Sequence, residues 1–445
     1  MPTLISFISD FIIAPTLVAI LIFAGIYMTF RLKFFHITKL GRIIKSLIYR
    51  KGPSGRSPLR EVTVALAGTL GVGNLMGVAA AIALGGAGSV FWMWMGALLS
   101  MVLKYSEIVL ALRSRVKKGD SYVGGAMYYL KSKTLRRIFA LLCICTSFTL
   151  GAMMQTEAVS ECFHSVFGVS PTMCGTLLAI AVFLIIIGGH AWISRFTSIV
   201  IPIACAVYII ISCFVIFTNL DRIPNIFADI FSSAFTPPAV SGGFMGCLIA
   251  FARPIRYGIS RGLITNEAGC GTAPIAHAAA DTDHPAAQGF WGLFEVFADT
   301  ILLCTLSALV ILIASPDLTS GGAMRAVLCS FSAYCGHSSD YILSISVLFF
   351  AVAGTVGWFY YGLVGLEFIL PENSHFPLLR RLYCILYALC VFLGAVCPSE
   401  MMWDLTDITV GLMAIINTPC ILSNAGEIVA QTKDFFTSQN KTAPL

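Results

Sequence analysis

Long apolar stretches recur along the whole chain and constrain its fold more than any other feature. Eleven of them reach the length of about 17–25 residues that an apolar helix needs to cross a bilayer. They lie near residues 10–31, 61–83, 88–112, 138–157, 172–190, 196–218, 243–275, 287–314, 341–369, 381–397 and 404–430. Only 11% of the residues are charged, against roughly 25% in soluble domains. The chain is therefore predicted to be an all-α polytopic membrane protein with about eleven transmembrane helices in a lipid bilayer.

Composition and motifs argue against several other classes of protein. The net charge of +6 comes from short basic clusters between apolar spans, so no nucleic-acid partner is expected. Most of the fifteen cysteines lie within apolar stretches, and their spacing indicates neither a transition-metal site nor a disulfide framework. No phosphate-binding loop, His-Glu-x-x-His or Gly-x-Ser-x-Gly occurs. We expect neither an enzyme nor an ATP-driven pump, and no cofactor.

Lysine and arginine are abundant in the connections on one side of the predicted spans and scarce in those on the other side. The connections after the first and third spans are rich in both, and more basic residues follow the fifth, ninth and eleventh spans. The opposite side carries only Arg222 and Arg325. We therefore expect a protein of the cell membrane (plasma or inner membrane) with its N-terminus outside and its C-terminus in the cytoplasm. The first apolar stretch lacks a preceding basic region and a cleavage site, which favours a membrane helix over a cleaved signal peptide.

The second and seventh spans contain residues that disfavour a continuous helix. Four glycines lie between Gly68 and Gly77. In the seventh span, more glycines surround Thr265-Asn266-Glu267-Ala268, with Pro254 and Pro274 on either side. Two interrupted helices five spans apart and opposite in direction are typical of an inverted-repeat transporter with its site at the breaks. Tight helix crossing at small residues is the alternative interpretation.

This pattern predicts four segments and one kind of ligand. The segments are an N-terminal helix with its basic loop (residues 1–60), a first five-helix repeat (61–218), an inverted second repeat (243–430) and a cytoplasmic tail (431–445). At a break, half-helix N-termini attract a carboxylate, and freed carbonyl groups can hold a small cation. An amino-acid zwitterion accompanied by Na⁺ matches both requirements.

Three ordered motifs connect the chain with a known family. They are Gly71-Val72-Gly73-Asn74-Leu75-Met76-Gly77, Lys104-Tyr105-Ser106-Glu107 and the run from Arg261 to Pro274. From Leu59 to Leu422 the chain closely resembles the alanine or glycine:cation symporter family, which belongs to the amino acid–polyamine–organocation superfamily. The resemblance implies a LeuT-like 5+5 inverted repeat with an extra N-terminal helix. It also implies import of alanine, glycine or a similar small neutral amino acid with Na⁺ or H⁺. An exchanger or channel-like facilitator of the same superfamily is the alternative.

The resemblance also implies a set of site residues. Those expected to contact the substrate are Thr69, Gly71, Val72, Gly73, Asn74, Gln155, Thr265, Asn266 and Trp358. Trp358 is expected to favour small side chains by its bulk. Those expected around the cation are Gly68, Thr69, Leu70 and Thr355, since hydroxyl and carbonyl oxygens suit a hard cation. The alternative for Gln155 is a helix–helix hydrogen bond, and the alternative for Thr355 is a hydrogen bond to its own helix.

Two acidic residues at membrane depth have both a structural and a functional interpretation. For Glu267 we favour an ion pair with Arg261 or Arg256 over a role in cation or proton coupling. For Asp299 we likewise favour structural bonding over coupling. His277 lacks metal-ligand spacing and is interpreted as a structural residue.

Four positions depart from the family pattern. The family usually has Phe at Ile264, Pro at Ala126, Asn at Val410 and Pro at Ile416. Ile264 directly precedes Thr265, so it bears on the choice among small amino acids. The sequence indicates neither that choice nor the oligomeric state.

Overall fold

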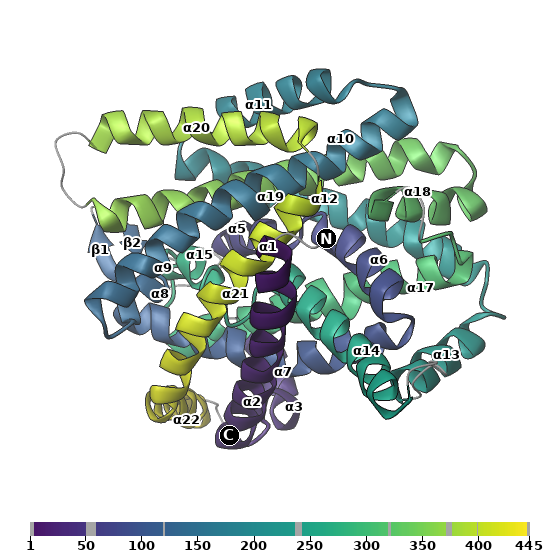
Figure 1. The fold of residues 1–445 in the computed structure, drawn as a ribbon. Helices are drawn as coiled ribbons and strands as arrows, with labels where there is room; N and C mark the ends of the chain where they lie inside the picture. The colour runs from purple at the N-terminus through teal and green to yellow at the C-terminus, as the bar shows by residue number, and fades with distance from the viewer. Residues whose placement is uncertain are drawn as a thin grey trace.

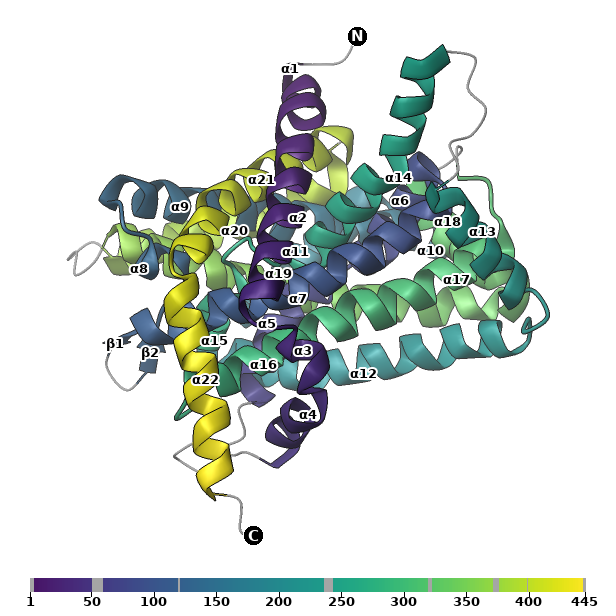
Figure 2. The same cartoon turned by 90° about the horizontal axis from the view of Figure 1, so that it is seen from below.

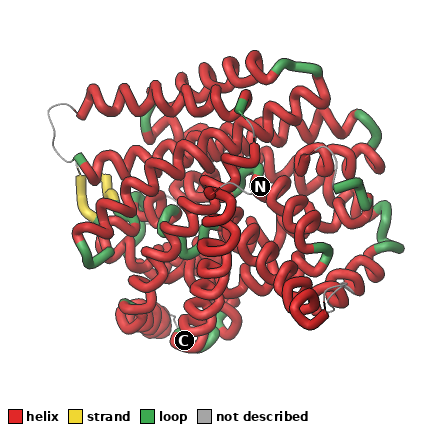
Figure 3. The backbone as a smooth tube through the Cα atoms, viewed as in Figure 1, coloured by secondary structure: helices red, strands yellow, loops and turns green. Residues whose placement is uncertain are grey.

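The computed structural model describes residues 4–49, 59–118, 121–235, 243–318, 322–370, 376–397 and 399–442, and these are almost entirely helical (Figures 1 and 3). Their one sheet is a hairpin of β1 (Val116–Lys118) and β2 (Ser121–Val123). The first helices, with η marking π-helical turns, are α1 (Leu4–Phe7), η1 (Ile8–Ile13), α2 (Ala14–Arg31), α3 (Phe35–Thr38) and α4 (Leu40–Tyr49).

The two predicted repeats appear as two successions of helices. The first contains α5 (Leu59–Thr69), α6 (Gly73–Gly85), α7 (Gly88–Ser114), α8 (Ala126–Tyr129), α9 (Lys133–Thr146), η2 (Ser147–Met153), α10 (Met154–Phe167), α11 (Pro171–Ile187) and α12 (His190–Phe217), and α13 (Ile223–Phe235) follows. The second contains α14 (Gly243–Asn266), α15 (Ala273–Ala278), α16 (Pro285–Val296), η3 (Phe297–Cys304), α17 (Thr305–Ala314), α18 (Gly322–Cys335), α19 (Ser338–Ile369), α20 (Phe376–Val396) and α21 (Ser399–Ser423), and α22 (Ala425–Thr442) ends the chain.

The helices account for the predicted spans. Nine helical stretches of the described chain are long and apolar enough to cross a membrane. The predicted fifth span corresponds to α11, an apolar helix of 17 residues. The predicted seventh span is the interrupted pair α14–α15. Together these make up the eleven spans expected from the sequence.

The last predicted span, 404–430, is wrong at its C-terminal end. Helix α21 ends at Ser423, and α22 starts at Ala425. At the junction, the Asn424 side chain donates to the Cys420 carbonyl oxygen at 2.7 Å and satisfies an end of α21. Helix α22 is a separate polar helix, because its sequence carries Glu427, Lys433 and Asp434.

Both predicted helix breaks are present. The first lies between Thr69 and Gly73, and the second lies between Asn266 and Ala273. Equivalent helices of the two halves pack on one another: α7 on α16, α10 on α19, and α11 on α20. Figure 1 shows the last two pairs running alongside each other. This arrangement places the two breaks inside a shared bundle.

Two helices outside the predicted spans cover one end of the bundle. Helix α13 packs on α7, and α18 packs on α6, at the same end of the molecule (Figure 2). Every fourth residue of α13 along one face is buried, namely Ile226, Ile230 and Ala234. A helix that is apolar on one face only is amphipathic, so α13 does not have the continuous apolar sequence of a membrane span.

Candidate functional site

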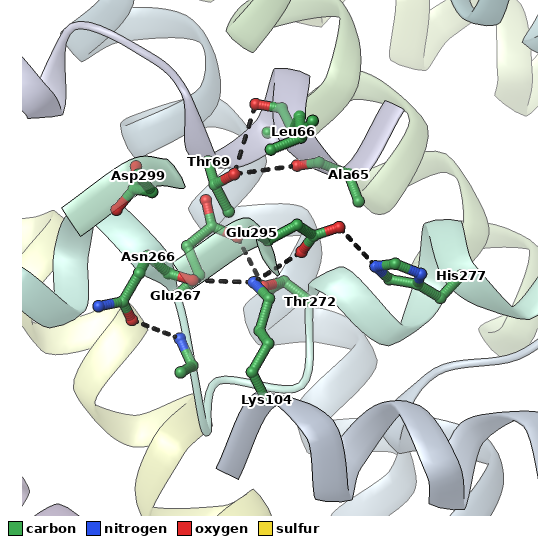
Figure 4. A network of polar contacts seen from close by, with 12 residues as sticks. Ala65, Leu66, Thr69, Lys104, Asn266, Glu267, Thr272, His277, Glu295 and Asp299 are labelled. Carbon is green, nitrogen blue, oxygen red and sulfur yellow. Dashed lines mark hydrogen bonds and ion pairs between the residues drawn. The ribbon is translucent and has the colours of Figure 1, made fainter. Parts of the chain in front are cut away.

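The two breaks lie against each other where α6 crosses α14. At Gly73 and Gly77 of α6, a Cβ would lie 3.5 and 3.6 Å from Cγ2 of Thr265. Thr265 stands in the last turn of α14, and its hydroxyl donates to the Gly262 carbonyl oxygen at 2.7 Å. The polar network around the second break is drawn in Figure 4, together with Thr69 of the first. The predicted substrate residues of both spans therefore belong to one region.

Gln155 holds the first break. Its Oε1 accepts a hydrogen bond from the Val72 backbone N–H at 3.2 Å. A Cβ at Gly71 would lie 2.9 Å from both Nε2 and Oε1 of Gln155, so only glycine leaves room for this contact. Gln155 thus makes a hydrogen bond between spans, to the unwound backbone itself, and its contact with the substrate stays a prediction.

Trp358 and Tyr361 of α19 contact Gly68, just before the same break. The Trp358 indole N–H donates to the Gly68 carbonyl oxygen at 3.2 Å. A Cβ at Gly68 would lie 2.7 Å from the Tyr361 hydroxyl oxygen. That hydroxyl is buried without a hydrogen-bond partner among the described residues. Tyr361 was not predicted as a site residue, although a tyrosine three residues after Trp358 shares its helix face.

The residues predicted around a cation are present but bonded within their own helices. The Thr355 hydroxyl donates to the Ala351 carbonyl oxygen at 2.7 Å, which is the alternative stated for it. The Thr69 hydroxyl lies 3.3 Å from the Ala65 carbonyl oxygen, to which it donates. Near Thr355, a Cβ at Gly357 would lie 3.1 Å from the Gly68 backbone nitrogen, so α19 and the end of α5 are in close contact.

Asn266 and Thr300 organise the second break. Asn266 donates from Nδ2 to the Thr300 hydroxyl at 3.0 Å and accepts from the Ala268 backbone N–H at 3.0 Å. The chain then turns through Glu267, Gly269 and Gly271, all with φ between 54° and 81°. A positive φ is strained for a glutamate but not for glycine, so the glycines of this segment are needed for the break.

Asp299 connects the break to α6. Its Oδ1 accepts from Asn74 Nδ2 at 2.7 Å, and its Oδ2 accepts from the Thr300 hydroxyl at 2.7 Å. Both Asp299 and Thr300 lie in η3, a π-helical segment of the eighth span. Such π-helical turns often occur at functional sites. These contacts support the structural interpretation of Asp299.

The predicted pairing of Glu267 with Arg261 is wrong. Arg261 instead binds Asp407 of α21 through both terminal nitrogens, at 3.1 and 3.2 Å. Glu267 accepts from the Thr272 hydroxyl at 2.7 Å across the break. Helix α14 ends at Asn266, and Glu267 follows it with φ 54°, so the Glu267 side chain belongs to the turn of the break and not to the helix face that carries Arg261. For Arg256, the side chain lies over the Tyr257 ring at 5.1 Å.

A buried charged chain supports the second break, as Figure 4 shows. Lys104 Nζ donates to the Asn266 carbonyl oxygen at 2.8 Å and lies 3.6 Å from Glu295 Oε2. Glu295 Oε1 lies 2.6 Å from His277 Nε2, and His277 Nδ1 lies 2.8 Å from Gln288 Nε2. With a ring proton on Nε2, His277 donates to Glu295 and accepts from Gln288 at Nδ1. The sequence signal was available, because a lysine and a glutamate inside apolar spans are costly unless they are paired.

Glu107 holds the turn of the second break from α7. Its Oε2 accepts from the Gly271 backbone N–H at 2.9 Å and from Asn417 Nδ2 at 3.0 Å. Asn417 also donates to the Gly269 carbonyl oxygen at 2.9 Å and accepts from the Tyr129 hydroxyl at 2.7 Å. The second break is therefore fixed by α7, α8 and α21 together.

Two of the four positions that depart from the family pattern lie in this region. Ile264 is buried beside Thr265, and a Cβ on Gly271 would lie 2.7 Å from the Cβ of Ala126. Val410 is buried and Ile416 half-buried in α21. Their effect on selectivity stays a prediction.

The side chains of the site are shielded from solvent in this conformation. Exposed fractions of 1–4% apply to Thr69, Asn74, Gln155, Thr265, Asn266 and Trp358. Within the described part of the chain, no group of three or more His, Cys, Asp or Glu side chains could hold a metal ion. The arrangement offers backbone N–H and carbonyl groups, threonine hydroxyls and side-chain amides, which suit a zwitterion and a hard cation.

Comparison with known proteins decides the family. The pattern of the sodium:alanine symporter family matches residues 1–444. This chain belongs to that family. The symporter is 36% identical to the sodium/alanine symporter AgcS of Methanococcus maripaludis over 97% of each chain. It is 32% identical to the probable sodium/glutamine symporter GlnT of Bacillus subtilis over 97% of this chain and 90% of that one. The family predicted from the motifs is confirmed, and with it amino-acid:cation symport.

Solved structures confirm the fold of the symporter. It is similar to MhsT in complex with L-phenylalanine, with a TM-score of 0.56 and 13% identity over 82% of this chain and 89% of that chain. It is also similar to a manganese transporter of Eremococcus coleocola, with a TM-score of 0.53 and 12% identity over 85% and 89%. At such identities the likeness shows the fold alone, which is LeuT-like.

Proposed function

We propose that this symporter imports a small neutral amino acid, alanine or glycine, together with Na⁺ by alternating access. The observation that carries the proposal is the contact between the two helix breaks, with Gln155 bonded to the unwound backbone of the first. Opening and closing of the helices around it would expose the buried site to one side of the membrane and then to the other. The other residues proposed for the site act around this contact.

The substrate carboxylate binds at the start of α6. The first N–H groups of a helix have no partner in a preceding turn, and the dipole there favours a negative charge. Gly73 and Asn74 are the first two residues of α6, directly after the break. Asn266 lies on the facing helix α14 and can turn its amide from Thr300 to the substrate. These features support recognition of an α-amino acid.

The space for the substrate side chain is small. Gln155 contacts the backbone at Gly71, where no Cβ fits. Trp358 is packed against Gly151 of the same span as Gln155, where an added Cβ would lie 2.3 Å from the Trp358 Cβ. The AgcS relative is named for alanine and GlnT for glutamine, so substrate size differs among relatives. The close packing supports alanine or glycine for this chain.

Sodium binds between the end of α5 and α19 in this proposal. Gly68, Thr69 and Leu70 supply carbonyl and hydroxyl oxygens from the first break, and Thr355 supplies a hydroxyl from α19. Their chemistry suits Na⁺. The acids Glu267 and Asp299 are already bonded to Thr272, Asn74 and Thr300. These contacts favour Na⁺ over a proton as the coupling ion.

Binding measurements on the purified symporter test this proposal. Alanine affinity is measured by calorimetry in NaCl and in choline chloride, with glycine, glutamine and phenylalanine as further ligands. We expect alanine and glycine to bind in NaCl only, and Asn266→Ala to lose alanine binding while it still inserts into membranes. Wild-type affinity in Asn266→Ala would contradict the site. A preference for glutamine would contradict the substrate assignment.

A further inference from the structure

A basic cavity lies outside the transport site, between α2–α3 and α22. Its volume is about 390 Å³, and four of its lining residues are basic: Arg31, Lys33, Lys39 and Lys433. No acidic residue of the described chain lines it. The remaining walls are largely apolar and include Phe436.

Both walls of the cavity follow directly on membrane spans. One candidate span ends at Arg31, and another ends at Ser423, just before α22. The cavity is therefore at the boundary between hydrocarbon and water, at one face of the membrane. Lys33 and Lys433 are exposed there. A phospholipid headgroup lies at this level of a bilayer.

The acidic residues of α22 do not neutralise the cavity. Glu427 accepts from Arg113 of α7 at 2.8 Å, and Asp434 lies 3.2 Å from His284. Inside the cavity, burial lowers the pKa of Lys39, and the charge of Arg42 lowers it further. Among the described residues, the four bases thus share one space that no carboxylate lines.

The shape of the cavity leaves room for a headgroup. Gly426 lies in the first turn of α22, and a Cβ there would have no atom within 4 Å. The N-terminus of this 18-residue helix adds positive potential to the same space. On the opposite wall, Lys39 Nζ lies 4.2 Å from the centre of the Phe436 ring, which holds the ammonium in place.

We propose that this cavity binds the phosphodiester headgroup of an anionic phospholipid. The ammonium groups of Lys33, Lys39 and Lys433 and the guanidinium of Arg31 surround the phosphate, while the apolar walls contact the glycerol and the first methylene groups. Basic pockets beside membrane helices recognise anionic lipids in this way. The bound lipid would connect the end of the first helix with the terminal helix, two elements far apart in the sequence.

Thermal unfolding and native mass spectrometry of the detergent-purified full chain test the proposal. The additions are phosphatidylglycerol, phosphatidylcholine and inorganic phosphate. We expect phosphatidylglycerol alone to raise the melting temperature and to remain bound in the gas phase. Equal stabilisation by inorganic phosphate would overturn the lipid assignment in favour of a free-anion site. Equal stabilisation by phosphatidylcholine would overturn a role for charge.

Two kinds of variant separate this site from general lipid attraction. The double variant Lys33→Gln with Lys433→Gln should weaken retention of phosphatidylglycerol roughly 30-fold. Each basic residue near an anionic lipid raises the affinity about fivefold, and the double variant removes two of them. The matched control, Lys133→Gln with Arg195→Gln, removes the same charge from exposed residues outside the cavity and should retain the lipid. Equal losses in both double variants would overturn the proposal.

A second variant keeps every charge and tests the site even if the double lysine variant does not fold. Gly426→Leu fills the open space, and leucine is also a better helix former than glycine. We expect a melting temperature without lipid at or above that of the wild type and no stabilisation by phosphatidylglycerol. Wild-type stabilisation by that lipid would overturn the placement of the headgroup beside α22.

Discussion

At Gly71 the transport site leaves no room for even a methyl group, because the Gln155 amide lies over the backbone. An added Cβ would be 2.9 Å from both polar atoms of that amide. The end of a glutamine side chain can swing away, but it would then lose its hydrogen bond to Val72. A substitution at Gly71 is therefore expected to affect the site more than the stability of the fold.

Gly71→Ala should weaken alanine binding about 5- to 10-fold, the equivalent of one hydrogen bond. The measurement is alanine affinity by calorimetry, with the melting temperature recorded alongside. Gly77→Ala is the matched control, because its Cβ would make only an ordinary 3.6 Å contact with Thr265. That variant should keep its affinity. Equal affinities in the two variants would argue against the role of Gln155.

Trp358→Ala should broaden substrate choice. Removing the indole opens space beside the first break and leaves the Gly68 carbonyl oxygen without its donor. Leucine and phenylalanine should then compete with labelled alanine, at a stability cost of about 3–5 kcal/mol. In the control, Trp94→Ala, a tryptophan that donates to Thr305 is removed, and selectivity should not change. Unchanged selectivity in both would refute the size limit.

Single residues were predictable where their chemistry is unusual for a membrane helix. Asn266 stands out as an amide in a break, and Asp299 as a carboxylate in a span. Their partners could not be predicted, because Asn74 and Asp299 are 225 residues apart and meet only through the fold. The predicted pairing of Glu267 with Arg261 was wrong for another reason: the two residues are close in sequence, but Glu267 lies beyond the end of α14, in the turn of the break.

At the scale of elements, the second break depends on support from neighbouring helices. Lys104 of α7 bonds the last carbonyl of α14 and faces Glu295 of α16. Removing one partner of a buried ion pair typically costs about 3–5 kcal/mol, because the other charge stays buried. The pair is thus expected to be strongly coupled.

A double-mutant cycle on Lys104→Met and Glu295→Gln measures this coupling. We expect each single variant to melt well below the wild type and the double variant to regain part of the loss. The pair Arg113→Met and Glu427→Gln is the control, since it is an exposed ion pair and should contribute at most about 1 kcal/mol. Additive losses for Lys104 and Glu295 would contradict a direct interaction.

Elements were predictable where the pattern is repetitive. Eleven apolar stretches and two glycine-rich interruptions were visible in the sequence, and both interruptions are breaks. Helices α13 and α18 were missed because they pack one face on the bundle instead of crossing the membrane. The end of α21 was missed because it depends on a local cap at Asn424, within a stretch that is still moderately apolar.

At the scale of the whole molecule, the basic connections predict the orientation. Green fluorescent protein fused to the C-terminus should fluoresce, because it folds in the cytoplasm, and alkaline phosphatase at the same place should be inactive. Fusion of each reporter after Arg222, on the side with few basic residues, should reverse the two signals. Active phosphatase at the C-terminus would contradict the predicted orientation.

Uptake of labelled alanine into proteoliposomes tests the central claim most directly, with a Na⁺ gradient or a proton gradient imposed separately. Two helix breaks in contact, in a protein of the sodium:alanine symporter family, should couple alanine to Na⁺. We predict that internal alanine transiently exceeds its equilibrium level under the Na⁺ gradient and not under the proton gradient. Uptake that never exceeds equilibrium under either gradient would contradict coupled import, and an overshoot under the proton gradient alone would contradict Na⁺ as the coupling ion.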